Sequence, residues 1–252
     1  MIAISLQSGS NGNCIYVESH GVRLLFDAGI SGIQTERRLF AHRREVRKIN
    51  AVIISHDHSD HVRCAGVLSR KYKLPVHVSD KTRRAAHTLE GVENVSEFRS
   101  GATLHFGAVT VETLRTPHDA ADGVVFIVSD GQKRLGILTD LGHVFDGLSD
   151  AVASLDGVFI ESNYDPEMLA NGPYPQRLQR RVRGPGGHLS NLEAAELLLA
   201  AASKRMKWVC LGHLSHNNNT PKLALETHRT VIGNRWPLHV ATRHAPTDVL
   251  EV

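Results

Sequence analysis

Short runs of apolar residues, many of them β-branched, recur along the whole chain and are separated by turns that contain glycine. Runs of this length and composition, bounded in this way, are typical of β-strands. We therefore predict strands at 2–6, 13–18, 22–26, 51–54, 75–78, 102–106, 108–114, 124–128, 134–138, 157–160, 208–211 and 238–242.

Between the strands lie stretches in which apolar residues recur at helical spacing. Two helix starts are explicit, because Ser190 and Glu193 form a capping box and Pro221 follows Thr220 at a first helical position. We predict helices at 33–40, 62–72, 80–89 (capped by Asp80), 175–182 and 190–203, and one that begins at 220. Because helices and strands interleave in both halves, we expect an α/β protein with two packed sheets and helices outside. No linker interrupts the pattern, so we expect a single domain over 1–252.

Composition adds that the protein is globular with a sizeable core, because 41% of its residues are hydrophobic and 22% are charged. No apolar run approaches the roughly 20 residues that span a bilayer, and the N-terminus lacks the features of a signal peptide. The three cysteines are widely separated and form no disulfide framework. We therefore expect a cytoplasmic protein with no membrane partner. A net charge of +3 is too small to indicate nucleic acid by itself.

Polar residues that suit metal binding directly follow several of the predicted strands. The densest group is the heptapeptide from Ser55 to His61, which contains three histidines and two aspartates between a buried strand and a helix. Imidazole and carboxylate groups bind Zn²⁺ and similar ions, and loops from several strand ends converge on one site. A surface loop that is rich in histidine by chance is the alternative. It leaves unexplained the similar placement of Asp27, His118, Asp140, Glu161 and His213.

These residues, in this order, resemble the five metal-site motifs of the metallo-β-lactamase superfamily. The match is carried by Asp27, His56-x-His58-x-Asp60-His61, His118, Asp140 and His213. The chain most closely resembles the YycJ/WalJ-like nuclease branch, in the motifs Ser8-Gly-Ser-Asn-Gly-Asn13, Glu161-Ser-Asn163, Gly187-His-Leu-Ser-Asn191 and Leu211-Gly-His-Leu-Ser215. The resemblance implies a four-layer αββα sandwich, in which helices flank two mixed β-sheets.

The superfamily pattern also implies two divalent metal ions that share a hydroxide, which would act as the nucleophile. One ion would be bound by His56, His58 and His118, and the other by Asp60, His61 and His213, with Asp140 as the bridge. This ligand set suits Zn²⁺, and a carboxylate-bridged pair also suits Mn²⁺ or Fe²⁺. The β-lactamases of the superfamily have Cys at the position of Asp140, which argues against lactam hydrolysis here.

Three further residues are expected to act beside the metals. Asp27 would accept hydrogen bonds from the ligand loop and hold it in place, although it could equally be an ordinary turn residue before Gly29. Glu161 and His188 resemble the Glu–His pair of the tRNA-processing phosphodiesterases of the superfamily. His188 could donate a proton to a leaving alkoxide or bind the phosphate, and the alternative is a turn residue that bonds the backbone. With Asp60 and Asp140, this pair makes up the expected catalytic group.

Substrate contacts are predicted just before His188, where arginines gather between 174 and 183. Arg177 and Arg181 could hold a phosphate backbone, and Tyr174 could stack on a base, whereas a solvated basic helix is the competing interpretation. Asn191, the last residue of the 187–191 motif, is a further candidate for substrate contact.

The leading hypothesis is a dinuclear-metal phosphodiesterase that acts as a nuclease, on DNA in preference to RNA, and the resemblance alone implies a 5′-to-3′ exonuclease. A small-molecule hydrolase of cyclic phosphates is the first alternative. A thioesterase of the glyoxalase II kind is the second, and it fits the Gly-His-Leu-Ser-Asn motif less well. A non-catalytic metal-stabilised module is a third, against which the intact ligand set argues.

Overall fold

The computed structural model describes residues 1–252 and contains two seven-stranded sheets. The first sheet has the order β14-β1-β2-β3-β4-β5-β6. In its antiparallel part the C-terminal strand β14 pairs with β1, followed by β2 and β3, and β3, β4, β5 and β6 are parallel to one another. The strands are β1 (Ile2–Gln7), β2 (Cys14–Ser19), β3 (Val22–Phe26), β4 (Ala51–Ile53), β5 (Val76–Ser79), β6 (Val95–Phe98) and β14 (Leu250–Glu251).

The second sheet has the order β13-β12-β11-β10-β9-β8-β7 and is also mixed. Strands β10 to β13 are parallel, and β7 to β10 are joined as antiparallel neighbours. The strands are β7 (Thr103–Phe106), β8 (Val109–Arg115), β9 (Val124–Ser129), β10 (Arg134–Leu138), β11 (Gly157–Glu161), β12 (Trp208–Gly212) and β13 (Leu238–Val240).

Alternation along the strands divides the core into three apolar layers. In β3, Leu24 and Phe26 point into the layer between the sheets, and Leu25 points to the outer layer. This follows from the pleat, because successive side chains leave a strand on opposite faces. Between the sheets, the rings of Phe26 and Phe126 lie 5.1 Å apart, centroid to centroid.

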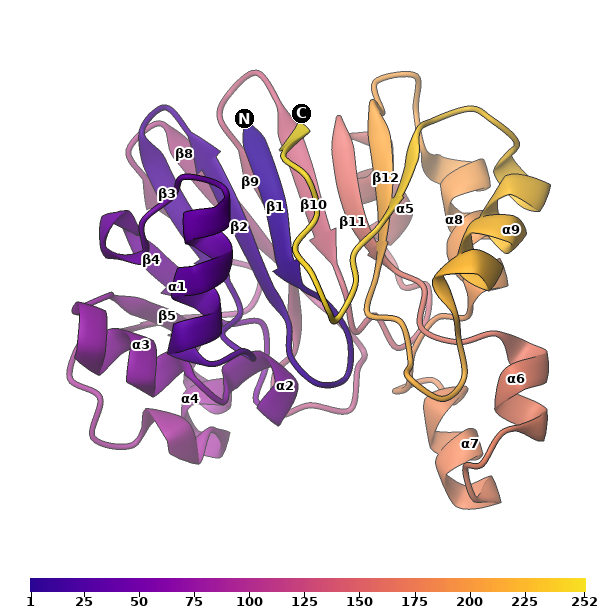
Figure 1. Cartoon of the computed structure of the whole chain (residues 1–252), viewed down its shortest axis with the longest axis horizontal. Coiled ribbons are helices and arrows are strands. Elements are labelled where there is room, and N and C mark those ends of the chain that lie inside the picture. Colours follow the sequence, from indigo (N-terminus) through magenta and orange to yellow (C-terminus); the bar gives the residue numbers. More distant parts are fainter.

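Helices cover both outer faces of the sandwich (Figure 1). α1 (Gly32–Ala41) and α3 (Ala65–Tyr72) pack on the first sheet. α5 (Leu148–Ala153), α8 (Asn191–Ala201) and α9 (Pro221–Ile232) pack on the second. The expected four-layer αββα arrangement is therefore confirmed. α6 (Pro166–Asn171) and α7 (Gln176–Val182) project below the second sheet in Figure 1, opposite the short helices α2 (Ser59–Val62) and α4 (Asp80–Ala85).

The helix predicted over 62–72 is wrong in its first turn. The chain forms α2, then a turn at Arg63 and Cys64, then α3. The break occurs because the Cys64 backbone N–H donates to the carbonyl of Ala28 at 2.8 Å, a partner outside any helix. This bond ties the ligand-bearing turn to the end of β3.

The helix predicted over 80–89 also ends early. α4 stops at Ala85, and a separate 3₁₀ turn covers His87–Leu89. Ser79, not Asp80, caps the helix, because its side chain accepts from the Thr82 N–H. Five other elements are absent from the prediction: β6, β14, α5, α6 and a 3₁₀ helix at Val46–Lys48. None of these helices combines the length and the apolar character that a membrane span requires.

Candidate metal centre

The turn after β4 and the end of β3 form one hydrogen-bonded unit. The carboxylate of Asp27 accepts from the Ser55 N–H at 2.8 Å, from the Ser55 hydroxyl at 2.9 Å and from His61 Nδ1 at 2.7 Å. All three residues are buried. The predicted position of Asp27 beneath the ligand loop matches this geometry, and a plain turn residue would not make these three bonds.

Close packing at this unit requires glycine at position 29. A Cβ built on Gly29 would lie 1.7 Å from the Asp60 carbonyl oxygen. That oxygen accepts from the Asn13 N–H at 2.7 Å, and the Gly29 N–H donates to the Asn13 carbonyl at 2.9 Å. The loops after β1, β3 and β4 therefore pass each other with no room for a side chain.

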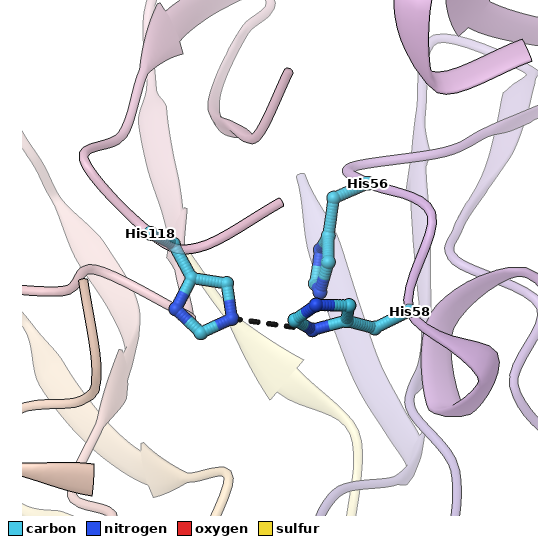
Figure 2. A group of neighbouring side chains, drawn as sticks. All are labelled: His56, His58 and His118. Atoms are coloured by element: carbon cyan, nitrogen blue, oxygen red, sulfur yellow. Dashed lines mark hydrogen bonds between the residues drawn. The ribbon is translucent and has the colours of Figure 1, made fainter. Parts of the chain in front are cut away.

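His56, His58 and His118 converge from two loops of different sheets, as Figure 2 shows. His58 Nδ1 lies 3.3 Å from His118 Nε2, and the candidate ligand atoms of the three residues lie within 4.8 Å of one another. His118 is oriented by the Gly187 carbonyl, which lies 2.8 Å from its Nδ1. The other ring nitrogen of His118 is thereby turned toward the site.

Asp60, His61 and His213 form the second group with the same spread of ligand atoms. His213 Nε2 lies 3.3 Å from Asp60 Oδ2, and His61 Nε2 lies 3.5 Å from the same oxygen. The group joins α2, in the first sheet's half, to the loop after β12, in the second.

Asp140 lies at the centre, between the two groups. Its Oδ2 is 3.2 Å from His61 Nε2, and its Oδ1 is 3.4 Å from His213 Nδ1 and 3.7 Å from His118 Nε2. One buried carboxylate thus contacts imidazoles of both groups, the position that a bridging ligand requires.

The backbone is unusual at three of these residues. Asp27, Asp140 and His213 have φ values of 63°, 58° and 54°. This left-handed region is sparsely populated by residues other than glycine, and its strain is found where function fixes the side-chain direction. Each of the three follows a strand within two residues, so the chain turns sharply and aims the side chain across the strand ends.

The residues present fit a metal centre on three observations of this structure. His56 Nε2 is buried and has no hydrogen-bond partner, which is costly unless something else pairs with it. His56, His61 and His118 each have Nδ1 within 2.9 Å of an oxygen, which turns Nε2 toward the other donors of the site. A second partner of this kind is usual for a metal-binding histidine. The donors are all imidazole and carboxylate, which suits Zn²⁺ or Mn²⁺.

The electrostatics favour a cation at the centre. Burial lowers the pKa of His56 well below 6.5, so this imidazole is neutral and can bind a metal. Burial also acts to lower the pKa of His61, but the carboxylates of Asp140, Asp27 and Asp60 outweigh it and raise the pKa well above 6.5. Against the same effect of burial, Asp140 and Asp60 raise the pKa of His213 to about 10. A metal ion that binds these two histidines must therefore displace protons from them.

Glu161 and His188 form the pair that the sequence suggested. His188 Nδ1 lies 2.6 Å from Glu161 Oε1, and Glu161 Oε2 accepts from the N–H groups of Leu141 and Leu189. Burial acts to raise the pKa of Glu161, but the charge and hydrogen bond of His188 and a hydrogen bond from His213 outweigh it and lower this pKa to about 2. His188 is partly exposed and lines the cavity over the metal centre.

This cavity, the site cavity, has a volume of about 180 Å³. One wall is the metal centre, and the other is formed by α7 and the loop before it, with Tyr174, Leu178 and Arg181. The guanidinium of Arg181 is bonded to both carboxylate oxygens of Asp119, at 2.7 and 2.8 Å, which holds α7 against the loop that carries His118.

The other two candidates for substrate contact lie away from this cavity. Arg177 is exposed on α7 and does not line it. Asn191 is fully buried, and its side chain bonds Ser162 at 2.6 Å and Asn219 at 3.1 Å. The structure thus gives Asn191 a different role from substrate contact, since it ties together the loops after β11 and β12.

Several residues of the centre escaped the sequence interpretation. Asn13 Nδ2 lies 3.0 Å from His61 Nε2 and 3.3 Å from Asp60 Oδ2, and the Ser8 hydroxyl accepts from the His213 N–H at 2.8 Å. Both belong to the 8–13 motif, which was quoted only as a mark of resemblance. Asn163 donates to the His213 carbonyl at 2.8 Å. The Ser and Asn residues of these motifs were the only sequence signal for such contacts, because a buried amide or hydroxyl needs a hydrogen-bond partner.

Comparison with known proteins gives concordant matches over nearly the whole chain. Residues 8–213 match the model of the Metallo-beta-lactamase superfamily. The chain is 36% identical over 232 residues to the exodeoxyribonuclease WalJ of Streptococcus pneumoniae, which covers 90% of this chain and 85% of that protein. It is 33% identical over 254 residues to the exodeoxyribonuclease YycJ of Bacillus anthracis, with 97% and 96% covered. Among solved structures, the metallo-beta-lactamase fold protein YhfI from Bacillus subtilis has a TM-score of 0.74 at 19% identity, with 98% of each chain covered.

Proposed function

The chain belongs to the metallo-β-lactamase superfamily, as the resemblance of its motifs implied, and we propose that it is a metal-dependent nuclease that degrades DNA from its ends. The observation that carries the proposal is the position of Asp140, whose two oxygens lie 3.2 to 3.7 Å from imidazoles of both histidine groups. Support for DNA as the substrate comes from the two exodeoxyribonucleases that are 33–36% identical to this chain. We also propose that degradation runs in the 5′-to-3′ direction.

Two divalent ions are proposed as the cofactor, with Zn²⁺ or Mn²⁺ as candidates. One ion would be bound by His56, His58 and His118. The other would be bound by Asp60, His61 and His213, and Asp140 would bind both ions. When bound, such ions stabilise charge on a phosphoryl group and activate water. Support comes from the two groups of three donors, in each of which the ligand atoms lie within 4.8 Å of one another, and from the buried His56 Nε2, which has no hydrogen-bond partner.

Residues of the chain itself supply proton donation, positioning of the ligands and contact with the substrate. Glu161, ionised and fixed by two backbone N–H groups, orients His188 through the 2.6 Å contact to Nδ1. This leaves Nε2 of His188 available to donate a hydrogen bond or a proton to the departing oxygen of a phosphodiester. Asp27 keeps His61 in place from below. Tyr174, which lines the site cavity, offers a ring on which a base can stack.

A substrate panel tests the proposal. Protein supplied with Mn²⁺ or Zn²⁺ is compared on end-labelled single- and double-stranded DNA, RNA, bis-p-nitrophenyl phosphate and a thioester. Metal-dependent release of nucleotides from DNA ends is expected, and 5′- and 3′-labelled strands report the direction. Asp140→Ala should be inactive, while Arg177→Ala, an exposed change outside the site cavity, should retain cleavage of the small diester. Thioester turnover without phosphodiester cleavage would refute the proposal, and cleavage of small diesters alone would replace DNA with a small-molecule substrate.

A further inference from the structure

A second cavity, the side cavity, opens next to the metal centre and has no role in the function proposed above. It has a volume of about 230 Å³, several times the roughly 30 Å³ share of one water molecule. Its walls are the loop between β12 and α9 and the segment that follows β13. The cavity is therefore large enough for a multi-atom group such as a phosphate with part of its sugar.

The lining of the side cavity is basic and hydroxylic. Arg243, His216 and His244 contribute nitrogen donors, Ser215 and Thr220 contribute hydroxyls, and no Asp or Glu lines the cavity. Arg243 forms no salt bridge with any carboxylate of the chain. Burial lowers the pKa of its guanidinium, as expected of a cation that has no anionic partner. An anion is the ligand that this set of donors suits.

Arg243 is held in place, so its position is a property of the fold. Its Nη2 donates to the Leu214 carbonyl at 2.9 Å, which uses one of the five guanidinium N–H groups. Arg38 donates from the other side to the carbonyls of Arg243 and His244, at 3.5 and 3.3 Å. The remaining donors of Arg243 are thus presented at a fixed place in the cavity wall.

The side cavity shares a wall with the metal centre. Ser215 lines both the site cavity and the side cavity. The loop after β12 begins with His213 at the metal centre and reaches His216 in the side cavity three residues later. Ser8, which accepts from the His213 N–H, also lines the side cavity. The two cavities are therefore neighbours, separated by Ser215 and the start of the loop after β12.

We propose that the side cavity binds a second phosphate of the substrate strand, next to the phosphate that is cleaved, with Arg243 as its main contact. This inference rests on the proposed nuclease function. A second phosphate site would favour a polynucleotide over a small diester, because only a strand presents two neighbouring phosphates. The N-terminus of α9, capped by Thr220, adds a favourable dipole at the same wall.

Dinucleotides with one or two phosphates test the inference. A dinucleoside monophosphate is compared with the same compound carrying an additional 5′- or 3′-phosphate, using the metal-loaded full chain. Arg243→Ala should lower kcat/KM about tenfold to a hundredfold for one of the doubly phosphorylated compounds, the usual cost of a lost charge-assisted hydrogen bond. It should leave the monophosphate nearly unchanged. The control Arg235→Ala, an exposed arginine outside the cavity, should affect neither.

An equal loss on all three substrates, or no loss on any, would overturn the inference. Calorimetry with deoxyadenosine monophosphate separates this failure from that of the proposed function. If the wild type cleaves no diester but binds the nucleotide more tightly than Arg243→Ala, the nuclease proposal fails and the anion cavity stands. If the wild type cleaves DNA and both proteins bind the nucleotide equally, the nuclease proposal stands and the anion cavity fails.

Discussion

At the scale of single residues, the ligand candidates could be identified from the chain because each follows a strand and is a histidine or a carboxylate. The residues that hold these candidates in position could not be identified in this way. Asn13 lies 47 and 48 residues away from Asp60 and His61, and Ser8 lies 205 residues from His213. Contacts of that separation depend on the completed fold. The burial of Asn191 could not be predicted either, because the same sequence motif can also stand at the start of an exposed helix.

Asn13→Ala should weaken metal binding about tenfold to a hundredfold without unfolding the protein, the usual effect of removing a partner of metal ligands. The reason is that the Asn13 amide steadies both Asp60 Oδ2 and His61 Nε2. Competition with a chelator, followed by metal analysis, measures the change. Asn11→Ala, two residues away and exposed, is the matched control. Unchanged affinity in Asn13→Ala would mean that the 8–13 motif does not support the ligands.

His188→Ala should lower kcat on DNA by about 10² to 10⁴, the range for loss of a general acid, with metal content unchanged. The decrease should be much smaller on bis-p-nitrophenyl phosphate, because p-nitrophenolate leaves without protonation. Steady-state kinetics on both substrates give the comparison, with His143→Ala as the control for a nearby exposed histidine. Equal losses on the two substrates would point to phosphate binding in place of proton donation.

At the scale of elements, apolar runs and turns were sufficient to predict most strands, and the capping box at Ser190 predicted the start of α8. The errors have local causes. β14 contains two residues, and α6 has six, which is too short for periodicity to emerge. In β6, Val-Ser-Glu-Phe, the two central residues are exposed and a single residue, Phe98, is buried. The split between α2 and α3 depends on the Cys64–Ala28 hydrogen bond, a tertiary contact.

α9 carries a pH-sensitive residue remote from the metal centre. His228 is fully buried, its Nε2 has no partner, and burial lowers its pKa from 6.5 to about 4. Below pH 6.5 the unfolded chain takes up a proton that the folded protein does not, until the pH approaches 4. The free energy of unfolding should therefore fall by up to about 1.4 kcal/mol per pH unit in that window.

His228→Leu should remove about 3 kcal/mol of the stability loss between pH 7 and pH 4, relative to the wild type. Urea denaturation at a series of pH values measures the difference in slope, whatever the variant does to stability at neutral pH. His105→Leu, at an exposed position of β7, should leave the slope unchanged. Parallel curves for the wild type and His228→Leu would contradict the assignment.

At the scale of the whole molecule, the candidate metal centre joins the two halves of the sandwich. Asp27 and the 56–61 turn come from the first sheet, whereas His118, Asp140 and His213 come from the second. We propose that residues 1–252 form one domain, since neither half holds a complete set of ligands. The sequence predicted the two-sheet arrangement from the interleaving of elements, and the resemblance supplied the pairing of ligands.

Because the candidate ligands span both sheets, metal ions should stabilise the folded state against global unfolding. At free metal 100-fold above Kd, the expected gain is about 2.7 kcal/mol per site. Thermal denaturation of chelator-treated protein, with and without Zn²⁺ or Mn²⁺, measures the gain. Asp140→Ala should lose most of it, and Arg235→Ala should keep it. A melting temperature that does not respond to metal would mean that these residues do not form a metal site.

The central claim is that DNA hydrolysis depends on metal ions held on both sides of Asp140. Its most direct test is the rate of hydrolysis of end-labelled DNA by chelator-treated protein as Mn²⁺ or Zn²⁺ is added in known equivalents. We predict no activity without metal, a rise that levels off near two equivalents per chain, and no rise in Asp140→Ala. Hydrolysis that persists in the chelator, or that Asp140→Ala retains in full, would contradict the account.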